Sequence, residues 1–269
     1  METKITKKTD GKILIITGFV AIVILFLIYS RFEYLNVTLD AVPVLQRIAF
    51  AFYIILGLSF CAISYGLYRF HKQQTTKNEN TILAIIGVIT YNKRSRQIFV
   101  AAFIAYGLFF ALASGIIVYQ PEVIFSEHYG AVVPSAHITS CCGPPGYMPK
   151  IVAFFTEHIG LQIIPINLVL LLVVSYLVGL NFAIAAKAFS ITKQGGGLGA
   201  IGASTGLFIA CPTCAGTVLS LLVGGSAIAL TIAIAQLQTV FIAISIPVLL
   251  VTPIIMTRRI RKIKSESCS

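Results

Sequence analysis

Two cysteines three positions apart, Cys211 and Cys214, are the residues of this sequence best suited to chemistry. They enclose Pro212 and Thr213 in a Cys-Pro-x-Cys motif. On a helix, a spacing of three residues places both sulfurs on one face. Two such thiols can form a disulfide, exchange it with another thiol, or bind one soft metal ion together. The motif therefore predicts either thiol redox chemistry or soft-metal binding.

The proline of this motif favours the redox interpretation. Pro212 donates no backbone hydrogen bond and tends to break a helix at its position. If a helical segment begins at the motif, its free amides stabilise a thiolate and lower the pKa of the thiol. The simpler alternative is that both cysteines act as small apolar residues in a closely packed helix, because residues 195–206 before them are mostly small.

A second candidate group lies in residues 120–160, which contain Cys141, Cys142 and three of the four histidines. The vicinal cysteines precede Gly-Pro-Pro-Gly, which predicts a tight turn that displays two thiols. Neighbouring cysteines rarely bond to each other without strain, so each thiol is expected to seek another partner. Metal binding is the alternative, because His, Cys and Met favour copper and zinc. Its candidate ligands are His128, His137, Met148 and His158, with Cys141 and Cys142.

The composition shows what must position these residues. The chain has 269 residues, of which 57% are hydrophobic and 11% are charged. A soluble domain is roughly 25% charged. A chain with so little charge cannot cover a water-facing surface, so we predict an all-α, multi-pass integral membrane protein with the lipid bilayer as its main partner.

The apolar stretches predict six transmembrane helices in a single membrane domain, residues 1–269. A helix that crosses about 30 Å of hydrocarbon needs about 20 apolar residues. The predicted spans are about 13–30, 42–69, 98–119, 161–182, 198–223 and 228–256. The fifth carries the Cys-Pro-x-Cys motif and is either continuous or re-entrant. Residues 120–160 form the longest loop, in which the apolar run 151–155 indicates a short helix lying on the membrane.

The basic residues predict the orientation of these spans. Cytoplasmic segments of membrane proteins are enriched in Lys and Arg. With the N-terminus inside, four basic residues precede or open the first span, six lie between the second and third, two follow the fourth and five follow the last. These are 17 of the 20 Lys and Arg residues. We therefore predict a multi-pass protein of the cell membrane with both termini cytoplasmic and residues 120–160 outside. The net charge of +11 then reflects topology, and we predict no nucleic-acid partner.

Two resemblances agree with these interpretations. The order Cys-Pro-x-Cys resembles the active-site motif of glutaredoxin-type oxidoreductases. Together with cysteines outside, it resembles the membrane electron carriers that pass thiol equivalents outward, the cytochrome-c-biogenesis and disulfide-reductase transporter class. Residues 199–204, leading into a Cys-containing span, are similar to mercuric-ion transporters. Those transporters place vicinal cysteines in the helix, whereas here the vicinal pair lies in a loop.

Three functional hypotheses follow. The first is a membrane thiol–disulfide redox carrier in which Cys211 and Cys214 exchange electrons with Cys141 and Cys142, and with an extracytoplasmic thiol protein. The second is a protein that binds or transports a soft metal of the copper type. The third is a non-catalytic membrane subunit in which the cysteines only pack. The spans lack Asp, Glu, Lys and His away from their ends, which argues against a proton pump or proton-coupled transporter.

Overall fold

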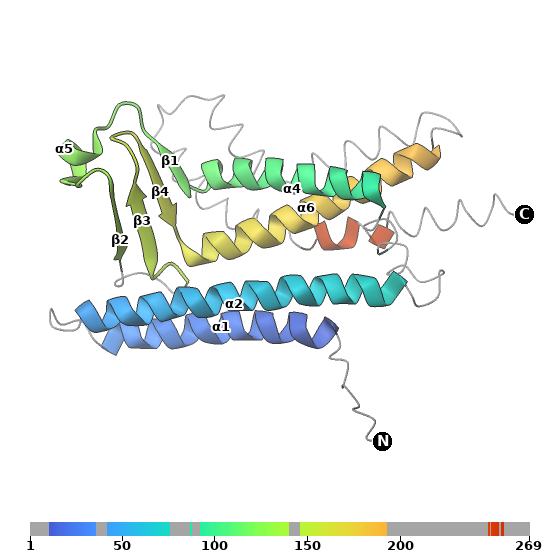
Figure 1. The fold of residues 1–269 in the computed structure, drawn as a ribbon, viewed down its shortest axis with the longest axis horizontal. Helices are drawn as coiled ribbons and strands as arrows, with labels where there is room; N and C mark the ends of the chain where they lie inside the picture. The colour runs from blue at the N-terminus through green and yellow to red at the C-terminus, as the bar shows by residue number, and fades with distance from the viewer. Residues whose placement is uncertain are drawn as a thin grey trace, which may run out of the picture. The chain divides into compact units, whose positions relative to one another are not determined.

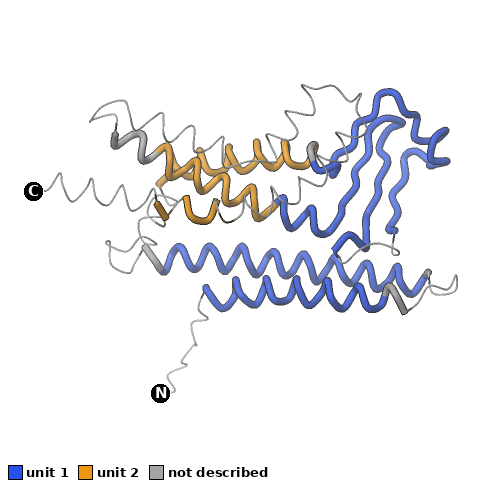
Figure 2. The backbone as a smooth tube through the Cα atoms, turned by 180° about the vertical axis from the view of Figure 1, so that it is seen from behind, with its two compact units in different colours: residues 1–77, 114–171 blue, residues 78–113, 172–269 orange. Residues whose placement is uncertain are grey.

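The computed structural model describes residues 11–35, 42–75, 87, 92–139, 146–192, 247, 249–252 and 254–255. The chain divides into two compact units (Figure 2). Unit 1 comprises residues 1–77 and 114–171, and unit 2 comprises residues 78–113 and 172–269. Each unit has its own cluster of buried apolar side chains.

Among the residues that the structure describes, four helices are long and apolar enough to cross a membrane (Figure 1). They are α1 (Gly11–Leu35), α2 (Val42–Thr75), α4 (Lys93–Ala113) and α6 (Pro165–Thr192). These helices confirm a helix-rich chain compatible with a lipid bilayer, and they match the first four predicted spans. The predicted fifth span lies outside the described residues. Of the sixth, residues 247, 249–252 and 254–255 are described, and they are helical.

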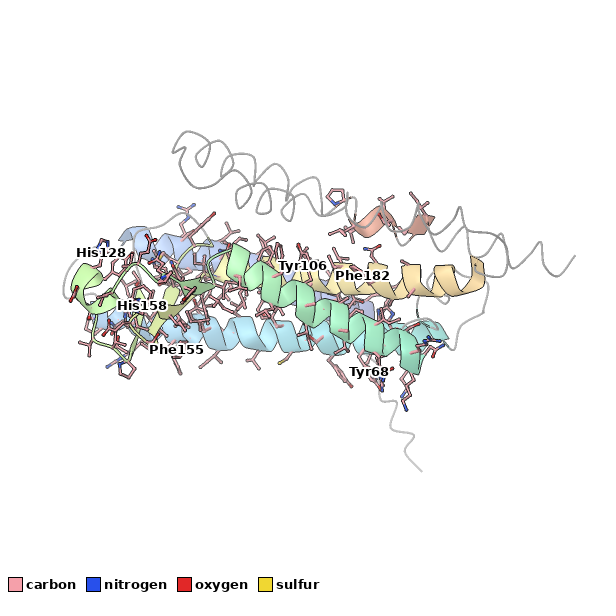
Figure 3. All side chains as sticks on the ribbon, turned by 90° about the horizontal axis from the view of Figure 1, so that it is seen from above. Tyr68, Tyr106, His128, Phe155, His158 and Phe182 are labelled. Carbon is pink, nitrogen blue, oxygen red and sulfur yellow. The ribbon has the colours of Figure 1, made fainter. Side chains whose placement is uncertain are left out.

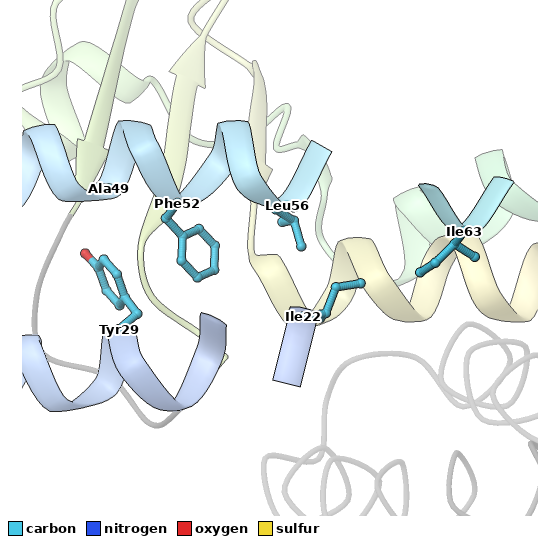
Figure 4. Packing of buried hydrophobic residues seen from close by; sticks show 6 residues of the cluster. All are labelled: Ile22, Tyr29, Ala49, Phe52, Leu56 and Ile63. Atoms are coloured by element: carbon cyan, nitrogen blue, oxygen red, sulfur yellow. The ribbon is translucent and has the colours of Figure 1, made fainter. Parts of the chain in front are cut away.

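Helices α1 and α2 lie side by side in unit 1 (Figure 1). Their shared core contains six buried side chains (Figure 4), namely Ile22, Tyr29, Ala49, Phe52, Leu56 and Ile63. Gly11 allows the backbones to approach, because a Cβ there would lie 2.6 Å from the backbone nitrogen of Phe70. Large apolar side chains elsewhere on the pair are exposed, including Ile16 at 62% and Leu58 at 64%. Such a surface suits a lipid environment.

A four-stranded antiparallel sheet lies between α4 and α6 in the sequence. Its strands are β1 (Ile117–Tyr119), β2 (Ser135–Thr139), β3 (Lys150–Phe154) and β4 (Ile159–Ile163), in the order β1-β4-β3-β2. The prediction of a short helix over residues 151–155 is wrong, because most of this run forms β3. Its backbone is paired with β2 on one side and β4 on the other.

The sheet also shortens two predicted spans. Helix α4 ends at Ala113, before the predicted boundary at residue 119, because Gly115 adopts a left-handed conformation with φ 71° that ends helices. Helix α6 begins at Pro165, after the predicted boundary at residue 161. Proline is favoured at the first helical position, where its missing N–H costs nothing. The residues removed from the two spans contribute to β1 and β4, which pair with each other.

The strand register separates the side chains of the sheet onto two faces. One face, called the apolar face below, carries Ile117, Tyr119, Ala136, Ile138, Ile151, Ala153, Ile159, Leu161 and Ile163. The opposite face carries His137, Lys150, Gln162 and the other polar side chains of the strands, together with Val118, Val152 and Phe154. The short helix α5 (Phe125–Tyr129) packs on this second face, where the rings of Phe125 and Phe154 have centroids 5.0 Å apart.

In unit 2, α6 packs close to α4 and to the described residues of the last helical segment. A Cβ on Gly179 would lie 3.0 Å from the backbone oxygen of Phe99, so the two helix backbones approach closely. Asn181 is 1% exposed, and its Nδ2 donates to the backbone oxygen of Leu249 at 3.0 Å. This hydrogen bond joins α6 to the helical residues 249–252.

Candidate functional site

The four candidate redox cysteines, Cys141, Cys142, Cys211 and Cys214, lie outside the described residues, so the roles assigned to them stay predictions. The described residues do locate the chain on either side of the vicinal pair. Thr139 of β2 is opposite Lys150 of β3 in the sheet register. Cys141 and Cys142 therefore belong to the connection of a β-hairpin, residues 140–149.

A hydroxyl from α2 holds one end of this connection. Tyr53 Oη lies 2.6 Å from the backbone oxygen of Pro149 and 3.1 Å from that of Ile163. Because a phenol has one proton, Tyr53 donates mainly to the nearer acceptor, Pro149. Pro149 itself is fully buried. The hydrogen bond therefore joins the start of β3 to α2 at a position buried from solvent.

Apolar packing holds both sides of the hairpin at this connection. Met148 and Ile138, on the two sides of the hairpin, pack against the core cluster of α1 and α2. A Cβ on Gly146 would lie 3.3 Å from the ring of Phe26, so the chain passes close to α1 there. The backbone oxygen of Gly146 also accepts a hydrogen bond from the backbone N–H of Ile166, at 2.9 Å. Residues 146–149 thus contact α1, α2 and the first turn of α6.

These contacts lie well inside the helix ends. Tyr53 follows Val42, the first residue of α2, by about 16 Å at 1.5 Å per residue. Phe26 precedes Leu35, the last residue of α1, by about 13 Å on the same basis. Both residues belong to candidate membrane spans. Residues 146–149 are therefore anchored on span residues, at the end of the hairpin opposite the β3–β4 turn.

The candidate metal ligands of the loop have other surroundings. His158 Nδ1 lies 3.0 Å from the backbone oxygen of Val123 and 3.2 Å from that of Gln120, so this nitrogen carries the proton and donates to carbonyls. His128 packs edge-on against Tyr129, with ring centroids 4.7 Å apart. Both histidines belong to unit 1. Figure 3 shows them close to α5 and the strands.

The other two candidate metal ligands, His137 and Met148, contact different parts of unit 1. His137 lies beside the ring of Phe154 on the face of the sheet that α5 covers, and Met148 packs against the α1–α2 core. Within the part of the chain that the structure describes, no three His, Cys, Asp or Glu side chains gather as a metal site requires. The described geometry therefore gives the metal hypothesis no support.

Sequence reasoning missed Tyr53 as a residue of this site. A signal was present, because a tyrosine inside an apolar span must find a partner for its hydroxyl. The sequence could not identify that partner, since the acceptor carbonyls are 96 and 110 residues away along the chain.

No protein-family model, curated protein or solved structure matches this chain. Its function is therefore inferred from its own residues and their arrangement.

Proposed function

We propose that the protein is a membrane thiol–disulfide redox carrier that uses Cys141 and Cys142 as one thiol pair and Cys211 and Cys214 as the other. The observation that carries this proposal is the anchoring of the hairpin connection on α1 and α2. The described residues 146–149, which follow the vicinal pair in the same connection, contact two candidate spans, and this supports an exchange of electrons with a pair in a membrane helix.

The proposal includes a topology of six spans with both termini cytoplasmic, in the cell membrane. The distribution of Lys and Arg supports this orientation, and it puts the sheet and the hairpin connection outside the cell. A reporter that is active only in the cytoplasm is expected to be active when it is fused at residues 76–80 or at the C-terminus. Activity of a C-terminal reporter that works only outside the cytoplasm would contradict this topology.

The exchange proceeds by thiolate attack. A thiolate of the outer pair, Cys141 or Cys142, attacks a disulfide of an extracytoplasmic thiol protein and releases one of its sulfurs as a thiolate. Cys211 then attacks the outer cysteine of this mixed disulfide, which releases the second substrate thiolate and forms a disulfide between the two pairs. Cys214 finally attacks Cys211, closes the Cys211–Cys214 disulfide and releases the outer cysteine as a thiolate.

The electrons balance in this sequence. The substrate disulfide gains two electrons and becomes two thiols, and the Cys211–Cys214 dithiol loses two electrons and becomes a disulfide. A dithiol protein on the cytoplasmic side would return the pair to its reduced state. The direction of flow is set by the reduction potentials of these partners.

Trapping of the inter-pair disulfide tests the proposal. In Cys214→Ser, the last step is blocked, so a disulfide that joins Cys211 to Cys141 or Cys142 is expected to accumulate in native membranes. Acid quenching, alkylation and non-reducing peptide mapping detect it. Cys61→Ser is the matched control, because this cysteine is an exposed free thiol on α2 and should not change the pattern.

Other outcomes would replace the proposal. If Cys214→Ser traps no inter-pair disulfide and the purified protein contains stoichiometric copper or zinc, the metal hypothesis takes its place. If the double variant Cys211→Ala, Cys214→Ala functions normally and no metal is bound, the cysteines only pack.

A further inference from the structure

We propose that the apolar face of the sheet lies on the surface of the lipid bilayer, so that the sheet is an interfacial element as well as a connector. This inference does not depend on the thiol chemistry. It rests on the side chains of that face, on the chain connections to two candidate spans, and on the position of the charged residues.

The apolar face is exposed at the end that bears the β3–β4 turn. Tyr119 of β1 is 64% exposed and its register partner Ile159 of β4 is 41% exposed. At the opposite end of the same face, Ile138 packs against the α1–α2 core. Among the described strands, this face carries only apolar side chains and the amphipathic Tyr119. An exposed apolar surface of this kind marks an interaction site.

The connections to the spans place the sheet at the membrane. One connection runs from the end of α4 at Ala113 to the start of β1 at Ile117. The other runs from the end of β4 at Ile163 to the start of α6 at Pro165. An extended chain covers at most about 3.6 Å per residue. The first residue of β1 and the last residue of β4 therefore lie within about 15 Å of the ends of the helices α4 and α6.

The charged residues are arranged on the other side. Glu122, just before α5, and Glu127, within α5, are both exposed. Helix α5 packs on the face of the sheet opposite the apolar face. Lys150 and His137 are also on that opposite face. The sheet is thus amphipathic, with one face suited to water and one to the boundary between headgroups and acyl chains. Tyrosine is enriched at this boundary in membrane proteins.

Insertion of the apolar face is a hydrophobic effect and needs no anionic lipid. The face offers no basic side chain to a headgroup phosphate, and nearby Glu122 and Glu127 would be repelled by anionic lipid. A second copy of the chain or a soluble protein could also cover an apolar face. The two short connections favour the bilayer, because they keep one end of β1 and one end of β4 near the ends of two candidate spans.

Tryptophan fluorescence tests the proposal sharply, because the chain contains no tryptophan. Tyr119→Trp reports on the apolar face, and Tyr129→Trp, at an exposed position of α5, is the matched control. The full-length chain is reconstituted in phosphatidylcholine vesicles whose acyl chains are brominated near the headgroups. We expect brominated lipid to quench the Tyr119→Trp variant at least threefold more strongly than the Tyr129→Trp variant, and aqueous acrylamide to show the reverse order. Replacing a third of the lipid with phosphatidylglycerol should leave both unchanged.

Three results would overturn the proposal. Equal quenching of the two variants by brominated lipid would show that the face is not at the bilayer. Protection of the tryptophan in Tyr119→Trp from both quenchers would show that protein covers the face, and protection only at high protein-to-lipid ratio would identify a second copy. Ile159→Trp, at the register partner, provides the same measurement if Tyr119→Trp does not fold.

Discussion

Removal of one hydroxyl from α2 should loosen the connection that carries Cys141 and Cys142. Tyr53→Phe deletes the hydrogen bond to the backbone oxygen of Pro149 and keeps the ring, which packs edge-on against Phe52 with centroids 5.6 Å apart. The change therefore removes a polar contact without creating a cavity.

The expected size follows from the burial of Pro149. Leaving a buried carbonyl without its donor costs about 1–3 kcal/mol. Each 1.4 kcal/mol is a factor of ten in an equilibrium. If the lost stability acts on local opening of the connection, the open population should rise roughly 5- to 150-fold.

Thiol labelling measures this opening. In a background of Cys61→Ser and Cys268→Ser, with Cys211 and Cys214 changed to Ala, Cys141 and Cys142 are the remaining thiols of the chain. The rate of their alkylation by N-ethylmaleimide in the reduced, purified protein should increase by the factor given above.

Tyr65→Phe is the matched control for this experiment. It makes the same chemical change on the same helix, at a side chain that is 54% exposed, and should leave the labelling rate unchanged. An alkylation rate for Tyr53→Phe within twofold of the parent protein, with the fold intact, would refute the anchoring of the connection by Tyr53.

Two further predictions concern helix packing, and both are checked by thermal unfolding in detergent. Gly11→Ala should lower Tm, because the new Cβ would lie 2.6 Å from the backbone nitrogen of Phe70. Gly57→Ala is the control and should leave Tm unchanged, since no described atom lies within 4 Å of its Cβ. Equal shifts in Tm for the two variants would contradict the close approach of α1 and α2. Asn181→Leu should lose about 1–3 kcal/mol by leaving the Leu249 carbonyl without its donor. Ser175→Ala should cost little, because the buried Ser175 Oγ has no partner among the described residues; a larger loss there than at Asn181 would refute this account.

The long helices could be predicted from the sequence because each contains an apolar run of transmembrane length. That signal is local and depends on nothing else in the chain. The predicted ends of two spans are wrong because residues 117–119 and 161–163 are mostly apolar and continue the apolar runs of the helices beside them. Over three to five residues, the twofold period of a strand cannot be distinguished from the continuation of a buried helix.

The sheet and the anchoring of the hairpin were beyond local reasoning for a different reason. Strand β1 pairs with β4, whose partner residues come 40 to 44 positions later, and Tyr53 donates to a carbonyl 96 residues away. Such pairings depend on the tertiary fold and leave no periodic trace in the sequence. The cysteine pairs are visible as residue types and spacing, but their proximity to each other is a property of the folded chain that only a direct measurement tests.

Electron transfer across a sealed vesicle tests the central claim most directly. The protein is reconstituted with a reduced dithiol protein enclosed and a protein disulfide outside, and the new external thiols are counted. We predict that they appear in proportion to the amount of carrier, and that the double variant Cys211→Ala, Cys214→Ala releases none above empty vesicles. Equal release by the parent protein and the double variant would contradict the claim that this chain carries thiol equivalents through its two cysteine pairs.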